Sequence, residues 1–234
     1  MGSTVLLAIN TSTLQFSIAL LAGDGSLLGE YYLGSGTRHF GGLVPAVDFL
    51  LAGLGRGKEE IECVAIAIGP GSFTGIRVGL SFAKGVCHVL KVPIVGISSL
   101  DALAAQIAES TLAITALIES RRNDVFVAQF RRGPGGQLTR LMSDQCVEYS
   151  ALTTSLALPC IFVGNNYHNQ VPKLKETLKP DLLLAPPEMW AIRACTVGAL
   201  GLRRFLSQDF DNPAALLPIY LRPPDIRPNP YLKT

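Results

Sequence analysis

The same order of secondary-structure elements occurs twice along this chain, and this order limits the possible folds more than any other feature. Short apolar runs predict strands, and apolar residues at spacings of three and four predict helices. In the first half they give three strands, then helix, strand, helix, strand and helix. These elements are expected at 5–9, 16–21, 27–33, 38–54, 63–68, 74–90, 92–97 and 98–109.

The second half resembles the first. Its elements are expected at 112–118, 125–130, 138–147, 150–156, 160–163, 167–178, 182–185 and 189–206. Two tandem βββαβα units are typical of the actin, sugar-kinase and Hsp70 superfamily, by analogy at the level of the fold. We therefore predict an α/β protein of the actin-like (ASKHA), ribonuclease H-like class. Its first lobe is expected over 1–108, and a degenerate second lobe with a C-terminal helix and an extended tail over 109–234.

Composition narrows the possible partners. Charged residues make up 16% of the chain, against about 25% in an average soluble domain, which leaves more apolar surface for a core or a partner to cover. A net charge of +2 does not support nucleic-acid binding by itself. Three arginine pairs are expected to be solvated. They are Arg121/Arg122, Arg131/Arg132 and Arg203/Arg204.

Cysteine usage and hydropathy bear on location. The five cysteines are widely spaced and form no CxxC motif, which favours a reducing compartment without disulfides. We recognise neither a secretory leader nor an apolar run of membrane-spanning length. The expectation is a cytoplasmic protein with no membrane partner.

The glycine-rich segment Ile68–Gly79 leads from a strand into a helix. Backbone N–H groups at such a helix start can bind an anion. The segment lacks the lysine of a phosphate-binding P-loop, and its third glycine is one residue too late for a dinucleotide fingerprint. Two interpretations of the segment stay open: it contacts a phosphate, or it is a tight turn that binds no ligand.

The helix that follows this loop carries Gly75, Gly79 and Ala83 at spacings of four. Small residues in such a stripe allow another helix to approach closely. Two interpretations are open: the stripe packs on the chain's own sheet, or it receives a helix of a partner protein.

Three motifs in the first half resemble the TsaB (YeaZ) family, the accessory subunit of bacterial tRNA threonylcarbamoyladenosine synthesis. The motifs are Leu7–Thr13, the string from Gly69 to Gly79, and Val92–Leu100. Glu119-Ser120-Arg121 and Leu217–Arg222 resemble a turn and a closing motif of that family. The resemblance extends over the whole chain but is weak from 130 to 210.

The resemblance implies a non-catalytic subunit needed for N6-threonylcarbamoyladenosine at adenosine 37 of tRNA. It implies a heterodimer with the catalytic paralogue TsaD, recruitment of the ATPase TsaE, tRNA contact only through the complex, and homodimers when the partner is absent. The contacts are expected on the helices at 38–54 and 74–90, and Gly79→Arg is expected to block association without unfolding. The interface residues are expected to be His39, Leu43, Gly75, Arg77, Gly79, Phe82, Ala83 and Val86.

A nucleotide or phosphate contact is a further expectation from the first turn and the glycine loop. Asn10 stands where the family usually has Asp, and an amide is a weaker ligand for Mg²⁺ than a carboxylate. We therefore expect no intrinsic cofactor, with ATP or ADP only at the complex interface. The candidate residues are Asn10, Thr11, Ser12, Gly69, Gly71, Ser72, Thr74 and Arg121.

Catalytic and metal-binding motifs are missing from the sequence. The stretch Ser98–Leu103 has no histidine where TsaD-like proteins carry a metal-binding HxxxH, and Ser72 has no recognisable His–Asp pair to activate it. We expect neither a catalytic residue nor a metal ligand. A stand-alone ATP-dependent kinase or phosphatase is the alternative, and a metallopeptidase-like protein is a more remote one.

Overall fold

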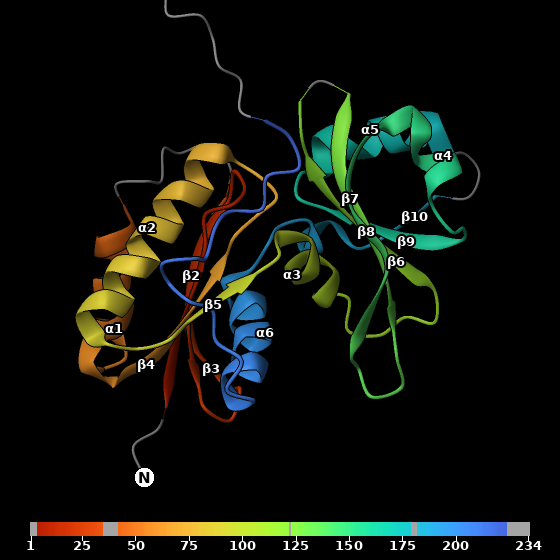
Figure 1. Cartoon of the computed structure of the whole chain (residues 1–234). Helices are drawn as coiled ribbons and strands as arrows, with labels where there is room; N and C mark the ends of the chain where they lie inside the picture. The colour runs from red at the N-terminus through yellow and green to blue at the C-terminus, as the bar shows by residue number, and fades with distance from the viewer. Residues whose placement is uncertain (1–3, 35–41, 122, 179–181, 224–234) are drawn as a thin grey trace, which may run out of the picture.

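The computed structural model describes residues 4–34, 42–121, 123–178 and 182–223, and it contains two five-stranded mixed sheets (Figure 1). The first sheet has the order β3-β2-β1-β4-β5. β1 pairs antiparallel with β2 and parallel with β4. Its strands are β1 (Val5–Asn10), β2 (Phe16–Ala22), β3 (Leu27–Leu33), β4 (Ile61–Ala67) and β5 (Ile94–Ile97).

The second sheet has the order β10-β9-β6-β7-β8, which is the same arrangement built from the next five strands. Its first strand likewise pairs antiparallel with the next strand and parallel with the fourth. The predicted repeat of the βββαβα unit is thus confirmed. The strands are β6 (Ala113–Glu119), β7 (Asp124–Arg132), β8 (Leu138–Glu148), β9 (Cys160–Gly164) and β10 (Leu183–Leu184).

Helices and sheets alternate as layers across the molecule (Figure 1). α1 (Leu43–Gly53) and α2 (Phe73–Leu90) cover one face of the first sheet. α3 (Ser99–Ala105) and α6 (Ala194–Leu206) share a core with both sheets. α4 (Leu152–Ser155) and α5 (Tyr167–Leu178) cover the far face of the second. Short 3₁₀ turns in the described residues include Lys58–Glu60, Tyr149–Ala151 and Pro187–Met189.

β1 shows why the central strands carry apolar side chains on both faces. Successive side chains of a strand point to opposite faces of the sheet. Val5 and Leu7 belong to the core under α1 and α2, whereas Leu6 and Ala8 belong to the core shared with α6. Because both faces are covered, the run has no polar alternation.

The two halves of the chain exchange helices. α6 comes after the second sheet in sequence, yet it packs on β1, β2, β4 and β5 of the first. Conversely, α3 comes from the first half and packs on β6, β7 and β9. The C-terminal helix was predicted to belong to the second lobe, and these contacts correct that prediction. Small residues permit it, since a Cβ at Gly198 would lie 2.3 Å from Leu21 and one at Gly201 would lie 2.4 Å from Ala65.

The last helix begins at Ala194, so the predicted start at 189 is wrong. The preceding segment is a buried connection instead. Trp190 donates its indole N–H to the carbonyl of Ala185 at 3.0 Å, and the carbonyl of Ile192 accepts a bond from Asn10 at 3.1 Å. A continuous helix would withdraw that carbonyl from Asn10, so the extended backbone is favoured here.

Within the described part of the chain, no helix combines the length and the apolar character needed to cross a bilayer.

Candidate functional site

The β1–β2 turn is tied into the structure by its own side chains. The Oδ1 atom of Asn10 accepts bonds from the N–H of Ser12 at 3.1 Å and from its hydroxyl at 2.8 Å. The amide of Asn10 donates to Ile192, and the hydroxyl of Thr11 donates to the carbonyl of Gly75 at 2.8 Å. These hydrogen-bonding groups are therefore used within the chain.

The glycine loop packs directly on that turn. The N–H of Ser72 donates to the carbonyl of Ser12 at 2.7 Å, and a Cβ at Gly71, where φ is +155°, would lie 2.0 Å from that oxygen. The Ser72 hydroxyl caps α2 by accepting from the N–H of Gly75. The loop is thus a strand-to-helix turn. The Ser72 side chain satisfies the N–H of Gly75, which has no partner within the helix.

A cleft of about 330 Å³ lies beside this turn and brings together part of the predicted phosphate-binding set. Asn10, Thr11 and Gly69 do not line it, and Thr74 is exposed outside it. The phosphate contact stays a prediction, now limited to the residues that face the cleft. These are Ser12, Gly71, Ser72 and Arg121.

The C-terminal segment occupies one wall of the cleft. The N–H of Ile219 donates to the carbonyl of Ile68 at 2.8 Å, and the Tyr220 ring lies 4.9 Å from that of Phe73. Arg77 stacks on Phe73 at 3.8 Å and donates from Nε to the Tyr220 hydroxyl at 2.8 Å. Arg77, expected at a partner interface, therefore fastens the chain's own tail.

The small-residue stripe of α2 faces the chain itself, which corrects the interpretation as a partner-binding groove. Gly75, Gly79 and Ala83 are all buried. A Cβ at Gly75 would lie 2.0 Å from the carbonyl oxygen of Thr11, and one at Gly79 would lie 2.1 Å from its Oγ1. The stripe exists because the β1–β2 turn approaches the helix, so Gly79→Arg would disrupt the fold before it affected any partner.

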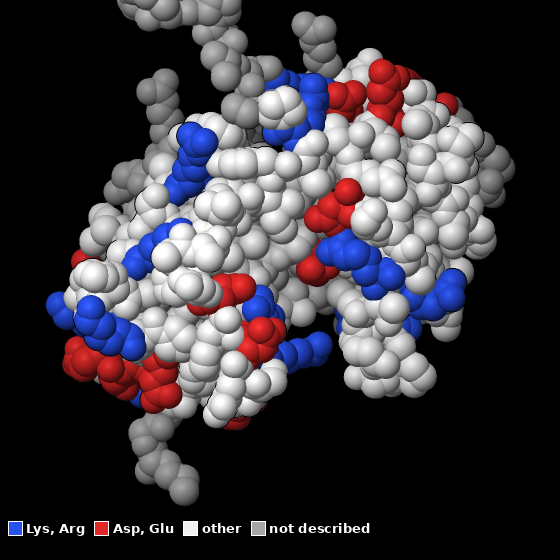
Figure 2. Space-filling view, viewed as in Figure 1, with Lys and Arg blue, Asp and Glu red and all other residues white. Residues whose placement is uncertain are grey.

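An apolar groove of about 360 Å³ lies on the outer side of α1 and α2. Phe82 and Val86, both predicted interface residues, line it, while Leu43 is buried in the core and His39 lies outside the described residues. The space-filling view shows a mostly uncharged surface over α2, with separate basic side chains along it and acidic and basic side chains together at its lower end (Figure 2). The lining includes Val44, Val47 and Leu51 of α1 and Phe82, Val86 and Val89 of α2.

Sequence reasoning missed the most exposed apolar side chains of this face. Val89 is 73% exposed and Val44 is 56% exposed, and both line the groove. Exposed apolar residues that cluster on one face commonly mark a protein-binding surface. The signal was available: α1 is apolar almost all round, whereas a helix covered on one side only needs one apolar stripe.

Reactive groups in the described residues are few. No set of three His, Cys, Asp or Glu side chains is grouped there as metal ligands would be. Burial raises the pKa of Cys63 to about 12 and that of Cys87 to about 11, so both thiols stay protonated and unreactive at neutral pH. The expectation of no metal and no catalytic residue stays a prediction.

Comparison with known proteins finds relatives whose names refer to tRNA modification. Residues 35–167 match the family model described as TsaD, tRNA N6-adenosine threonylcarbamoyltransferase. The tRNA threonylcarbamoyladenosine biosynthesis protein TsaB of Bacillus subtilis is 30% identical over 69% of this chain and 71% of its own length. TsaB of Haemophilus influenzae is 36% identical over 56% of each chain, so the match spans about half of that relative.

Solved structures agree at the level of the fold. YeaZ from Pseudomonas aeruginosa superposes with a TM-score of 0.79 at 22% identity, over 93% of this chain and all of the other. Component A of the (R)-2-hydroxyglutaryl-CoA dehydratase of Acidaminococcus fermentans superposes with a TM-score of 0.53 at 10% identity, over 86% of this chain and 98% of the other. With two repeated sheets, the glycine loop on the β1–β2 turn and these relatives, the chain belongs to the TsaB (YeaZ) family.

Proposed function

We propose that this chain is a non-catalytic subunit of the machinery that makes threonylcarbamoyladenosine on tRNA. The names of the TsaB relatives support the pathway. One structural contrast supports the role of a binding subunit. The apolar groove on α1 and α2 is open at the surface. The polar groups of the β1–β2 turn and the glycine loop, by contrast, form hydrogen bonds with one another. A subunit that acts by binding a partner needs an open apolar surface of this kind and does not need a reactive centre.

The partner that fits the groove is a TsaD-type protein. The TsaD family model matches this chain from 35 to 167, a range that includes α1 and α2, so such a partner is expected to present related helices. Two related helix pairs can pack face to face in a nearly symmetric four-helix contact. By the same geometry, a homodimer is expected when the partner is absent.

Further parts of the proposal concern the complex as a whole. It includes recruitment of a TsaE-type ATPase, ATP or ADP bound at the complex interface, indirect contact with tRNA and a cytoplasmic location. The isolated chain is expected not to turn over ATP, which separates this role from that of a stand-alone kinase. Calorimetry and phosphate release on the purified chain test that distinction.

The direct test places a charge on the groove. Val89→Asp introduces an exposed carboxylate without disturbing a core, so the variant should fold normally. Association with the TsaD-type protein of the same organism should weaken at least about 10-fold, because the carboxylate must lose water at an apolar contact. Co-purification followed by size-exclusion chromatography with light scattering measures this.

Leu206→Asp is the matched control, since Leu206 is 65% exposed on α6, away from the groove. It should leave both association and the melting temperature unchanged. Equal association of the Val89 variant and the parent chain would refute the assignment of this face, and loss of modification activity on omitting the subunit tests the pathway separately.

A further inference from the structure

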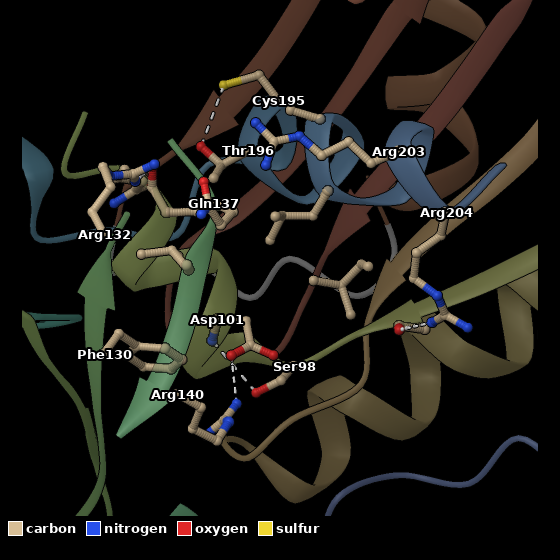
Figure 3. A pocket seen from close by; sticks show the side chains of 17 residues that line it. Ser98, Asp101, Phe130, Arg132, Gln137, Arg140, Cys195, Thr196, Arg203 and Arg204 are labelled. Carbon is tan, nitrogen blue, oxygen red and sulfur yellow. Dashed lines mark hydrogen bonds and ion pairs between the residues drawn. The ribbon is translucent and has the colours of Figure 1, made fainter. Parts of the chain in front are cut away.

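A second and larger cavity, of about 750 Å³, lies between the two sheets. It shares no lining residue with the cleft beside the β1–β2 turn. α3 and α6 form one side, and β7 and β8 form the other (Figure 3). Ile97, Phe130 and Leu200 give it apolar walls, and its size is typical of a small-molecule site.

Four arginines and a single carboxylate line this cavity. Two of the arginines are neutralised by acidic neighbours. Arg140 pairs with Asp101 and Asp144, and Arg204 pairs with Asp209 at 2.7 Å. In the space-filling view both signs of charge meet in the hollow between the lobes (Figure 2). Arg204 also pairs with Asp211 at 3.1 Å, so each of these arginines faces two carboxylates and neither supplies uncompensated positive charge to the cavity.

No acidic side chain of the described residues pairs with Arg132 or Arg203. Arg132 donates to the carbonyls of Gly136 and Ala105, but its Nε atom is buried without a hydrogen-bond partner. The Arg203 guanidinium makes no hydrogen bond or ion pair with any residue that the structure describes; its backbone carbonyl, by contrast, accepts bonds from Ser207. Burial and, after it, the charge of Arg203 lower the pKa of Arg132, so the two guanidinium groups repel one another.

Figure 3 shows the Arg203 side chain reaching from α6 toward Arg132 and Gln137. The Gln137 amide and the Thr196 hydroxyl line the same part of the cavity. Two guanidinium groups without an acidic partner, beside two neutral polar groups, form a site for an anion with several acceptor oxygens.

We propose that this cavity binds a phosphate monoester with a nucleoside-sized body. A phosphate monoester carries nearly two negative charges at neutral pH, which matches Arg132 and Arg203 together, whereas one carboxylate balances only one of them. The apolar walls at Ile97, Phe130 and Leu200 receive the organic part. The site is independent of the helix groove, so it holds or fails apart from the role proposed above.

Adenosine 5′-monophosphate, adenosine, inorganic phosphate and succinate are the probes, titrated into the full chain by calorimetry. AMP is expected to bind, and adenosine at least about 10-fold more weakly, because it lacks the group that the arginines contact. Arg203→Gln should weaken AMP about 10- to 100-fold with no change in melting temperature, since the side chain bonds to no described residue.

Arg131→Gln is the matched control, because Arg131 precedes Arg132 on β7 and does not line the cavity. It should leave AMP affinity within about 2-fold. Absence of AMP binding at about 10 mM, binding that Arg203→Gln does not weaken, or an equal loss in the Arg131 variant would overturn the site. Succinate binding as tight as that of inorganic phosphate would overturn the assignment to phosphate.

Discussion

The hydroxyl oxygen of Thr11 lies 2.1 Å from the position that a Cβ atom on Gly79 would take. That oxygen is held in place because it donates its proton to the carbonyl of Gly75. Gly79→Ala should therefore lower the free energy of unfolding by about 1–3 kcal/mol through overpacking, against a helix-propensity gain of about 1 kcal/mol. Urea denaturation measures the difference.

Gly85→Ala on the same helix is the control for Gly79→Ala. No atom lies within 4 Å of a Cβ at Gly85, so only the propensity gain applies, and stability should rise by up to about 1 kcal/mol. Similar stability changes in the two variants would show that the Thr11 contact does not limit residue 79.

Glu30 on β3 binds the start of α6. Its Oε1 atom accepts from the N–H of Cys195 at 3.1 Å, and its Oε2 atom accepts from the Arg193 guanidinium at 2.5 Å. The side chain is only 4% exposed, and the helix has no capping side chain of its own. Glu30→Ala should cost about 2–3 kcal/mol, because it removes charge-assisted bonds and leaves Arg193 unpaired.

Thermal and urea unfolding of Glu30→Ala, beside Glu62→Ala, test this role. Glu62 lies on β4 of the same sheet but is exposed, so its replacement should change stability by less than about 0.5 kcal/mol. An equally small effect at Glu30 would mean that α6 does not depend on the carboxylate.

Tyr220 holds the tail on the first lobe through Phe73 and Arg77. Tyr220→Ala should speed hydrogen exchange at the amide of Ile219 about 10- to 100-fold, because that N–H bonds to Ile68 only while the segment is docked. Tyr220→Phe keeps the ring contact and should change the rate by less than about 10-fold. Equal exchange in the parent and the Ala variant would contradict the clamp.

The buried thiol of Cys63 makes stability depend on alkaline pH. Its pKa is about 12 in the folded chain because of burial, against 9.0 without it. A raised folded pKa gives stability that is complete below pH 9 and is lost between pH 9 and 12, as the unfolded chain ionises first. From pH 8 to 10.5 the loss should be about 1–2 kcal/mol, and Cys63→Ala should show a correspondingly shallower decline in urea titrations. If the stability of Cys63→Ala and of the parent chain declined equally with pH, the Cys63 thiol would not be the cause of the decline.

The order of elements was predictable because each depends on neighbours in sequence. The apolar runs at Val5–Asn10 and Ile61–Ala67 contain the strand signal themselves, and the turn at Asn10 and the cap at Ser72 act over two or three residues. The packing of α6 on the first sheet and of α3 on the second needed information from distant residues, such as Leu21 and Ala65, which lie opposite the glycines of α6.

The site residues were harder to predict because one pattern fits several environments. Gly75 and Gly79 are compatible with a partner helix or with a turn of the same chain, and only the position of Thr11 decides between them. Arg132 and Arg203 appeared as members of ordinary surface pairs. Their meeting across the cavity depends on the placement of α6 beside β7, which no local signal encodes.

The exchange of helices has a consequence for synthesis on the ribosome. When β5 has been made, one face of the first sheet is still bare, because α6 lies beyond every strand of the second sheet in the sequence. The nascent polypeptide must keep the apolar side chains of Leu6 and Leu21 from aggregating until translation is nearly finished. The first sheet therefore receives its last covering helix only when residues 194–206 have been made, and a chain that ends before Ala194 is expected to have an unstable first lobe.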